Sequence, residues 1–397
     1  MGSEGRRGGG SSSWTAYLHD PRTRGVVFQI ALMLALGLFI WEVASNTAAN
    51  LAKQNIASGF DFLDRTAGFD ISQSLIAYSN TATYARAFWV GLWNTVLVAV
   101  IGILVATVLG FAIGVARLSA NWLVARLATL YVEVVRNVPL LLQLFVWYVA
   151  VLRALPPPAQ SWELPFGAFL NLRGLTLPRV ISQPGIEVVA LAAGAAIVLA
   201  IVIGLWAARR RRRTGKSFPV FWTGAALVVL LPLAALVAAG LPIAFDTPRL
   251  GRFNVEGGLA IQPEFAALVL GLATYTAAFI AEIVRAGIES VPRGLKEAGA
   301  ALGLHQGQVL RLVVIPLALR VIIPPLTNQY LNLTKNSSLA VAVGYPDLVS
   351  VFAGTVLNQT GQAVEAILMT MAVYLTLSLL TAALMNWFNA RMAIVER

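Results

Sequence analysis

The residues of this chain that could carry chemistry are few, and they form no catalytic set. The 397 residues include no cysteine, which excludes disulfides, thiolate nucleophiles and cysteine-ligated metals. The two histidines, His19 and His305, lie far apart in the sequence, so little is available for a metal site. Residues 215–217 (Gly-Lys-Ser) resemble the end of a phosphate-binding loop, but that motif needs a glycine where this chain has Arg210. We therefore expect no metal site, no nucleotide site and no covalent catalysis here.

The most informative polar stretch is the loop 285–308. Pro292 and Gly294 precede an alanine-rich run, and Gly303 suits the left-handed residue that ends a helix. These positions predict a short helix outside the membrane. Its small residues would allow close docking in a groove of another protein, but a solvated loop helix fits the pattern equally well.

Several polar residues stand inside apolar stretches. Three asparagines follow one another at i+4 and would share one helix face, with Ser337 beside them: Asn328, Asn332 and Asn336. Such a stripe should face protein or water rather than lipid. Interhelical hydrogen bonds and a translocation path both remain open for it, as they do for Asn94 and Gln143.

Charged and small residues also occur at helical spacing. Two pairs of opposite charge are separated by three residues, Glu133 with Arg136 and Glu282 with Arg285. This spacing favours ion pairs within one helix, with a role in gating or at an interface as the second interpretation. Gly110 and Gly114 form a GxxxG motif, which predicts close helix packing.

These residues must be positioned by helices that cross a membrane. The chain is 58% hydrophobic and 12% charged, whereas soluble proteins are about 25% charged. A span needs about 20 predominantly apolar residues. The sequence predicts an all-α polytopic membrane protein with about eight spans, over residues 25–45, 87–116, 122–152, 186–208, 218–241, 263–285, 309–333 and 362–389. Pro316, Pro324 and Pro325 are expected to interrupt the seventh.

The net charge of +11 comes from basic residues that flank the apolar runs. They are not interleaved with stacking aromatics, which argues against nucleic acid as a partner. If the amino terminus is cytoplasmic, 18 of the 29 Lys and Arg residues lie on the cytoplasmic side and nine outside. The positive-inside rule then predicts that both termini are cytoplasmic. The five arginines at 209–213 are interpreted as a topology anchor near anionic lipid.

The loop also resembles a known motif. Glu297-Ala298-Gly299, Gly303 and Pro316 resemble the EAA loop of the membrane subunits of type I ABC importers, with Gly299 in place of the usual second alanine. Further stretches are similar to the polar amino-acid branch of that family: 91–95, 131–143, 282–285, 291–294 and 335–339. The resemblance is strongest to the Q-type permease of general L-amino-acid or glutamate/glutamine/aspartate/asparagine importers of Gram-negative bacteria.

The resemblance implies a domain layout built on the MetI-like fold. Its five-helix core would comprise residues 87–152 and 263–397. The remaining parts would be a flexible cytoplasmic tail, an extra first helix with a periplasmic loop, and an insertion with two extra helices: 1–23, 24–86 and 153–262, respectively.

The resemblance also implies a coupling role for the loop, because the EAA loop docks on the ATPase subunit. Glu297 would offer charge to a basic groove, Ala298, Gly299 and Gly303 would permit close approach, and Arg293 would contact the rim. ATP and Mg would bind the partner ATPase subunits, and this chain would hold no cofactor. Other implied partners are a second permease, more in keeping with a heterodimer than a homodimer, a periplasmic amino-acid-binding protein and membrane lipid, in a bacterial inner membrane.

Two other functions, secondary transport and a membrane scaffold, are alternatives to an importer. A secondary transporter driven by an ion gradient would often show inverted repeats and carboxylates near the midplane, whereas the acids here lie near the ends of the spans. A membrane scaffold would not need a docking loop. Co-purification of an ATPase would separate these alternatives from an importer.

Overall fold

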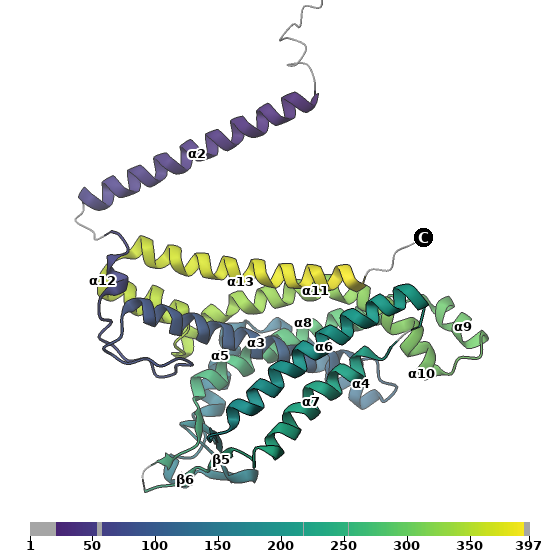
Figure 1. Ribbon diagram of the computed structural model, residues 1–397. Coiled ribbons are helices and arrows are strands. Elements are labelled where there is room, and N and C mark those ends of the chain that lie inside the picture. The colour runs from purple at the N-terminus through teal and green to yellow at the C-terminus, as the bar shows by residue number, and fades with distance from the viewer. Residues whose placement is uncertain (1–20, 54–57, 217, 253, 393–397) are drawn as a thin grey trace, which may run out of the picture.

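The computed structural model describes residues 21–53, 58–216, 218–252 and 254–392. Most of the predicted tail, with His19, lies outside these residues. Among them, seven helices are long and apolar enough to cross a membrane, or eight if a bent pair counts as one span. This confirms the predicted helical membrane fold. The first of them, α2 (Pro21–Lys53), stands apart from the other helices in Figure 1.

Four long helices form the core of the bundle: α3 (Tyr84–Ala116), α8 (Pro263–Glu289), α11 (Ile315–Asn336) and α13 (Ala363–Met392). Glycines bring α3 against α8. A Cβ at Gly110 would lie 2.5 Å from Cβ of Ile280, and one at Gly114 would lie 2.8 Å from Cβ of Val284. The packing predicted for the GxxxG motif is therefore present, since the backbones approach more closely than a side chain would allow.

The third predicted span, 122–152, is present as a bent pair of helices that together are long and apolar enough to form one span. It consists of α4 (Trp122–Asn137), followed by α5 (Leu140–Phe145) and the π-helical turn η2 (Val146–Leu152) after a bend of 109°. Pro139 follows the bend, and Val138 before it is extended at ψ 129°, as the residue preceding a proline prefers. The side-chain amide of Gln143 donates to the Val135 and Val138 carbonyls at 2.8 and 2.9 Å. It thereby satisfies carbonyl groups that the end of α4 leaves open.

The prediction that prolines interrupt the seventh span is wrong. Helix α11 begins at Ile315 and continues through Pro324 and Pro325 to Asn336. Pro316 is the second residue of α11, and the helical path runs through it without a break. The preceding π-helical turn η5 (Leu310–Val314) connects it to α10 (Gln306–Val309). Neighbouring α8 and α13 pack along α11, a setting in which a membrane helix tolerates proline.

Small antiparallel sheets form at one end of the bundle, which we call the sheet end. The four-stranded sheet has the order β1 (Trp162–Leu164), β2 (Ala168–Asn171), β3 (Gly174–Leu177) and β8 (Leu259–Ile261). Two strand pairs accompany it, β4 (Arg179–Ser182) with β5 (Ile243–Asp246) and β6 (Arg249–Leu250) with β7 (Val255–Glu256). Short helical turns at the same end are η1 (Asp61–Asp64) and α12 (Leu357–Thr360).

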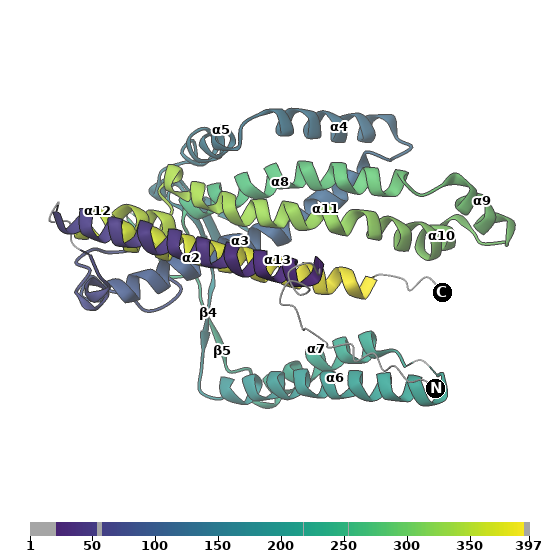
Figure 2. The same cartoon turned by 90° about the horizontal axis from the view of Figure 1, so that it is seen from above.

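Between the strands, the chain forms a helical hairpin. Helices α6 (Ile186–Thr214) and α7 (Val220–Ala238) pack on each other. Figure 2 shows this hairpin beside the bundle and joined to it through β4 and β5. At the opposite end of the bundle lies α9 (Arg293–Ala301), next to α10. We call this the α9 end.

Candidate functional site

The predicted helix in the loop 285–308 is present as α9 and protrudes from the bundle (Figure 1). Pro292 precedes its first residue, so Gly294 lies in the first turn and not before the helix. Gly303 follows the helix with a φ of +80°, a left-handed conformation that glycine adopts without strain. Its N–H donates to the Ala300 carbonyl at 2.9 Å. The loop sequence therefore sets both ends of the helix.

The predicted coupling residues divide between two faces of α9 and its ends. Arg293, Glu297, Ala298 and Gly303 are exposed. Gly299 is buried instead, and a Cβ there would lie 3.2 Å from Cγ2 of Val309 on α10. The small residue at 299 thus packs α9 on its own chain. Sequence reasoning missed Leu302, which is 81% exposed at the end of α9. An apolar residue directly before the helix-ending Gly303 was the available signal.

A cluster of charges joins three helices near the α9 end. The Glu282 carboxylate on α8 contacts the Arg117 guanidinium, which directly follows α3. It lies 2.6 Å from the guanidinium of Arg285 on its own helix and 3.8 Å from that of Arg136 on α4. The predicted pair of Glu282 and Arg285 is confirmed. The carboxylate also makes contacts that spacing along one helix does not show.

The other predicted pair, Glu133 with Arg136, is wrong. The Arg136 side chain turns to α8, where its guanidinium lies 5.2 Å from the ring centroid of Phe279 in addition to approaching Glu282. No ion pair of Glu133 is present among the described residues. An aromatic face together with a carboxylate on a neighbouring helix therefore replaces the local partner.

The predicted polar stripe on α11 divides into an exposed part and a buried part. Asn328 and Asn332 are exposed, Asn336 is half-buried and Ser337 is fully buried. The hydroxyl of Ser337 donates to the Thr334 carbonyl at 2.8 Å. Within the described residues the side chains of the first two asparagines form no hydrogen bond. They therefore present amide groups on an outer face of the helix.

The two polar candidates outside α11 bind their own chain. Asn94 is fully buried, and its side-chain amide donates to the carbonyls of Gln73 and Pro346 at 2.8 and 2.9 Å. Gln143 caps the end of α4, as described above. For both residues the structure shows hydrogen bonds within the chain.

Asp347 is a buried acid that sequence reasoning missed. It is 0% exposed, accepts from the Ser350 N–H at 2.8 Å and accepts from the Tyr374 hydroxyl at 3.0 Å. Burial raises the pKa of Asp347 to about 7. The neighbouring Leu348 N–H donates to the Thr95 hydroxyl at 3.0 Å. The segment therefore ties α3 to α13, and the single acid in the apolar run 339–349 was the signal.

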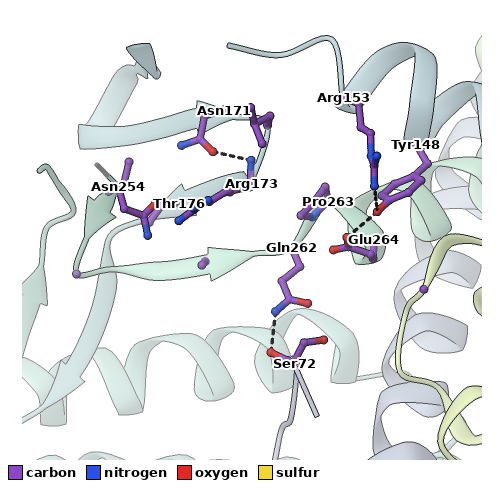
Figure 3. A pocket seen from close by; sticks show the side chains of 15 residues that line it. Ser72, Tyr148, Arg153, Asn171, Arg173, Thr176, Asn254, Gln262, Pro263 and Glu264 are labelled. Atoms are coloured by element: carbon purple, nitrogen blue, oxygen red, sulfur yellow. Dashed lines mark hydrogen bonds between the residues drawn. The ribbon is translucent and has the colours of Figure 1, made fainter. Parts of the chain in front are cut away.

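A cavity of about 760 Å³ opens at the sheet end, between the four-stranded sheet and the start of α8 (Figure 3). Arg153 and Glu264 both bond the phenol of Tyr148 on one side of it. Asn171 and Arg173 lie on the other side. Sequence reasoning did not identify this cavity, because its walls come from segments far apart in the chain.

Comparison with known proteins decides the family. Residues 196–394 match the family model described as the binding-protein-dependent transport system inner membrane component. The chain belongs to this family. The resemblance to importer permeases is thereby confirmed, and the chain is a transport component rather than an enzyme. The family does not favour the ion-gradient-driven alternative.

Relatives match almost the whole length of this transport component. It is 55% identical to the general L-amino acid transport system permease protein AapQ of Rhizobium johnstonii, over 97% of this chain and 96% of the relative. It is 52% identical to the putative amino-acid ABC transporter permease protein YhdX of Escherichia coli, over 95% and 96%. Identity is 41% to the glutamate/glutamine/aspartate/asparagine transport system permease protein BztB of Rhodobacter capsulatus, over 96% of both chains.

Proposed function

We propose that this chain is the permease subunit of an ABC importer that moves polar L-amino acids into the bacterial cytoplasm. The observation that carries the proposal is the near-complete match to amino-acid permeases, at up to 55% identity. The fold agrees with this role, since its helices can cross a membrane several times.

Helix α9 would couple this subunit to a separate ATPase. It protrudes from the α9 end and exposes a carboxylate, Glu297, next to the small residue Ala298 and close to the apolar Leu302. A charged contact beside a large apolar side chain is typical of a protein interface. ATP and Mg would bind only the ATPase, and this chain would need no cofactor. The charge cluster on Glu282 would keep α3, α4 and α8 together while α9 transmits force to them.

The translocation path would run along the exposed polar face of α11. Asn328 and Asn332 offer amide groups that the described part of the chain does not use, and lipid could not satisfy them. A second permease facing this surface would enclose the path. We propose a heterodimer, because the extra helices α2, α6 and α7 suggest a specialised partner. A periplasmic amino-acid-binding protein would deliver substrate at the sheet end.

The proposed orientation places the α9 end in the cytoplasm with both chain termini. The five arginines at 209–213 close helix α6, which ends on the same side as α9 in Figure 1. Cationic residues on the cytoplasmic side agree with the positive-inside rule and would contact anionic lipid. Under this orientation, residues 87–152 and 263–397 would form the core, with 24–86 and 153–262 as additions.

Reconstitution tests the proposed function. The transporter, assembled with its ATPase, partner permease and binding protein in proteoliposomes, should accumulate radiolabelled L-glutamate or L-glutamine only when ATP and the binding protein are present. An ionophore that collapses ion gradients should leave uptake intact. Uptake that continues without ATP and stops with the ionophore would show secondary transport instead.

A further inference from the structure

The sheet-end cavity has the size and the charges of a small-molecule site. Its volume is about 760 Å³, within the range of roughly 300–1,000 Å³ typical of ligand pockets. In Figure 3, Arg153, Tyr148 and Glu264 lie on one side, and Asn171 and Arg173 lie on the other. Asn171 and Arg173 of the insertion 153–262 thus face the beginning of a core helix across the cavity.

The first side holds a positive and a negative group around one phenol oxygen. Nη2 of Arg153 donates to the Tyr148 oxygen at 3.2 Å, and the Tyr148 hydroxyl donates to Oε1 of Glu264 at 2.8 Å. The guanidinium and the carboxylate form no salt bridge with each other or with another described residue. An α-amino acid carries a carboxylate and an ammonium group on the same carbon atom. Its carboxylate could therefore pair with Arg153 while its ammonium pairs with Glu264.

The second side holds Arg173, which forms no ion pair with any residue that the structure describes. The backbone N–H of Arg173 donates to Oδ1 of Asn171 at 2.7 Å. Asn171 is itself 2% exposed and donates to the Ser161 hydroxyl at 2.8 Å. This turn holds the backbone in place, while the Arg173 guanidinium makes no bond to the described chain. Thr176 and Asn254 add polar groups on the same side.

The start of α8 adds to the positive potential of the cavity. The helix is 27 residues long and begins at Pro263, which lines the cavity. The side chain of Gln262 does not cap it but donates to the Ser72 carbonyl at 2.6 Å. The positive end of the helix dipole therefore lies at the cavity. Together with two arginines against one glutamate, it favours an anionic ligand.

We propose that the sheet-end cavity binds a free α-amino acid whose side chain ends in a carboxylate or an amide. Arg153 and Glu264 hold the carboxylate and the ammonium of the head group, and Arg173 binds the end of the side chain. The insertion thereby gives the permease a selective site of its own before the membrane is crossed. This inference rests on the proposed function and adds a site and a preferred class of substrate.

Equilibrium binding tests the assignment. The assembled transporter, purified without its binding protein, is titrated with tritiated L-glutamate and with tritiated L-serine. Arg173→Gln should weaken glutamate binding by about tenfold or more, the effect of losing a charged hydrogen bond, and should change serine binding by less than about twofold. Glu264→Gln should weaken the binding of both. Arg179→Gln, an exposed arginine on β4 outside the cavity, is the matched control and should change neither.

Two results would overturn the assignment: the wild-type complex binds neither amino acid, or Arg173→Gln behaves like Arg179→Gln. Size-exclusion chromatography of each complex separates a lost site from a lost fold. ATP-driven uptake with the binding protein, measured in parallel, separates failure of the proposed site from failure of the proposed function. If uptake is intact while the cavity variants bind amino acids as the wild type does, the proposed site is refuted and the proposed importer function is not. If the wild type imports no amino acid, the proposed function itself fails.

Discussion

Replacing Glu282 by glutamine should destabilise the bundle more than replacing Glu289, the other acid of α8 that forms an ion pair. Its carboxylate contacts the guanidinium groups of Arg117 and Arg285 and lies 3.8 Å from that of Arg136. The Arg117 side chain is 10% exposed, so water replaces little of the lost interaction. Removing one partner of a buried ion pair costs about 3–5 kcal/mol. Because the Glu282 side chain is 27% exposed, we expect about 3 kcal/mol, the lower end.

Thermal unfolding of the purified chain in one detergent measures this loss. Glu282→Gln should lower the melting midpoint by about 3–4 °C, because the unfolding entropy of 397 residues is about 0.8 kcal/mol/K. Glu289→Gln is the control, because that carboxylate is 50% exposed and its ion pair is with Arg285; an exposed pair contributes about 0–1 kcal/mol. The double variant with Arg117→Gln should recover part of the loss, because it removes the unpaired charge. Equal midpoints for the two glutamate variants, or strictly additive effects, would refute the reasoning.

Three further predictions concern packing, protonation and orientation. Gly110→Ala should destabilise the chain by about 1–3 kcal/mol, because its Cβ would lie 2.5 Å from an atom of α8; Gly37→Ala, with nothing within 4 Å, should be silent in the same melt. The pKa of Asp347 is about 7 in the folded chain, against 3.8 for the free side chain. The folded chain therefore holds this proton where the unfolded chain has lost it, so the stability from Asp347 is full below pH 3.8 and is lost as the pH rises through 7. Asp347→Asn should flatten the fall in melting midpoint between pH 5 and 8, and an unchanged slope would contradict the burial argument. In right-side-out vesicles, an impermeant maleimide should label Gly257→Cys and not Gly215→Cys; the reverse pattern would invert the proposed orientation.

The sequence predicted those features that depend on local pattern. Long apolar runs predicted the spans, and the residues around Pro292 and Gly303 predicted α9. The helix ends follow from the backbone conformations that proline and glycine prefer in any protein. For this reason the short helix could be located before any contact was known.

The sequence did not predict the features that depend on contacts between distant residues. Arg136 has an acid three residues before it, yet its guanidinium approaches Glu282 on another helix. Gly299 looked like an outward-facing small residue, but its contact is Val309. The sheet-end cavity combines side chains from η2, the β2–β3 turn and α8. Spacing along one helix contains no information on which neighbour lies opposite.

The rule that proline ends a helix holds at one place in this chain and fails at another. Pro139 accompanies a bend of 109°, whereas Pro324 and Pro325 lie within an uninterrupted helix. The backbone differs between the two places, since Val138 before Pro139 is extended whereas α11 stays helical through both of its prolines. The presence of a proline therefore does not by itself predict where a membrane helix ends.

Contact between α9 and the ATPase is the core of the proposed coupling, and photo-crosslinking detects it in the assembled transporter. The chain has no cysteine, so Leu302→Cys can carry a benzophenone maleimide on the exposed end of α9. Phe166→Cys, which replaces a side chain that is 95% exposed at the sheet end, is the matched control. Irradiation of the assembled transporter should join the ATPase subunit to position 302 and not to position 166. An absent adduct at 302, or equal adducts at both positions, would contradict the claim.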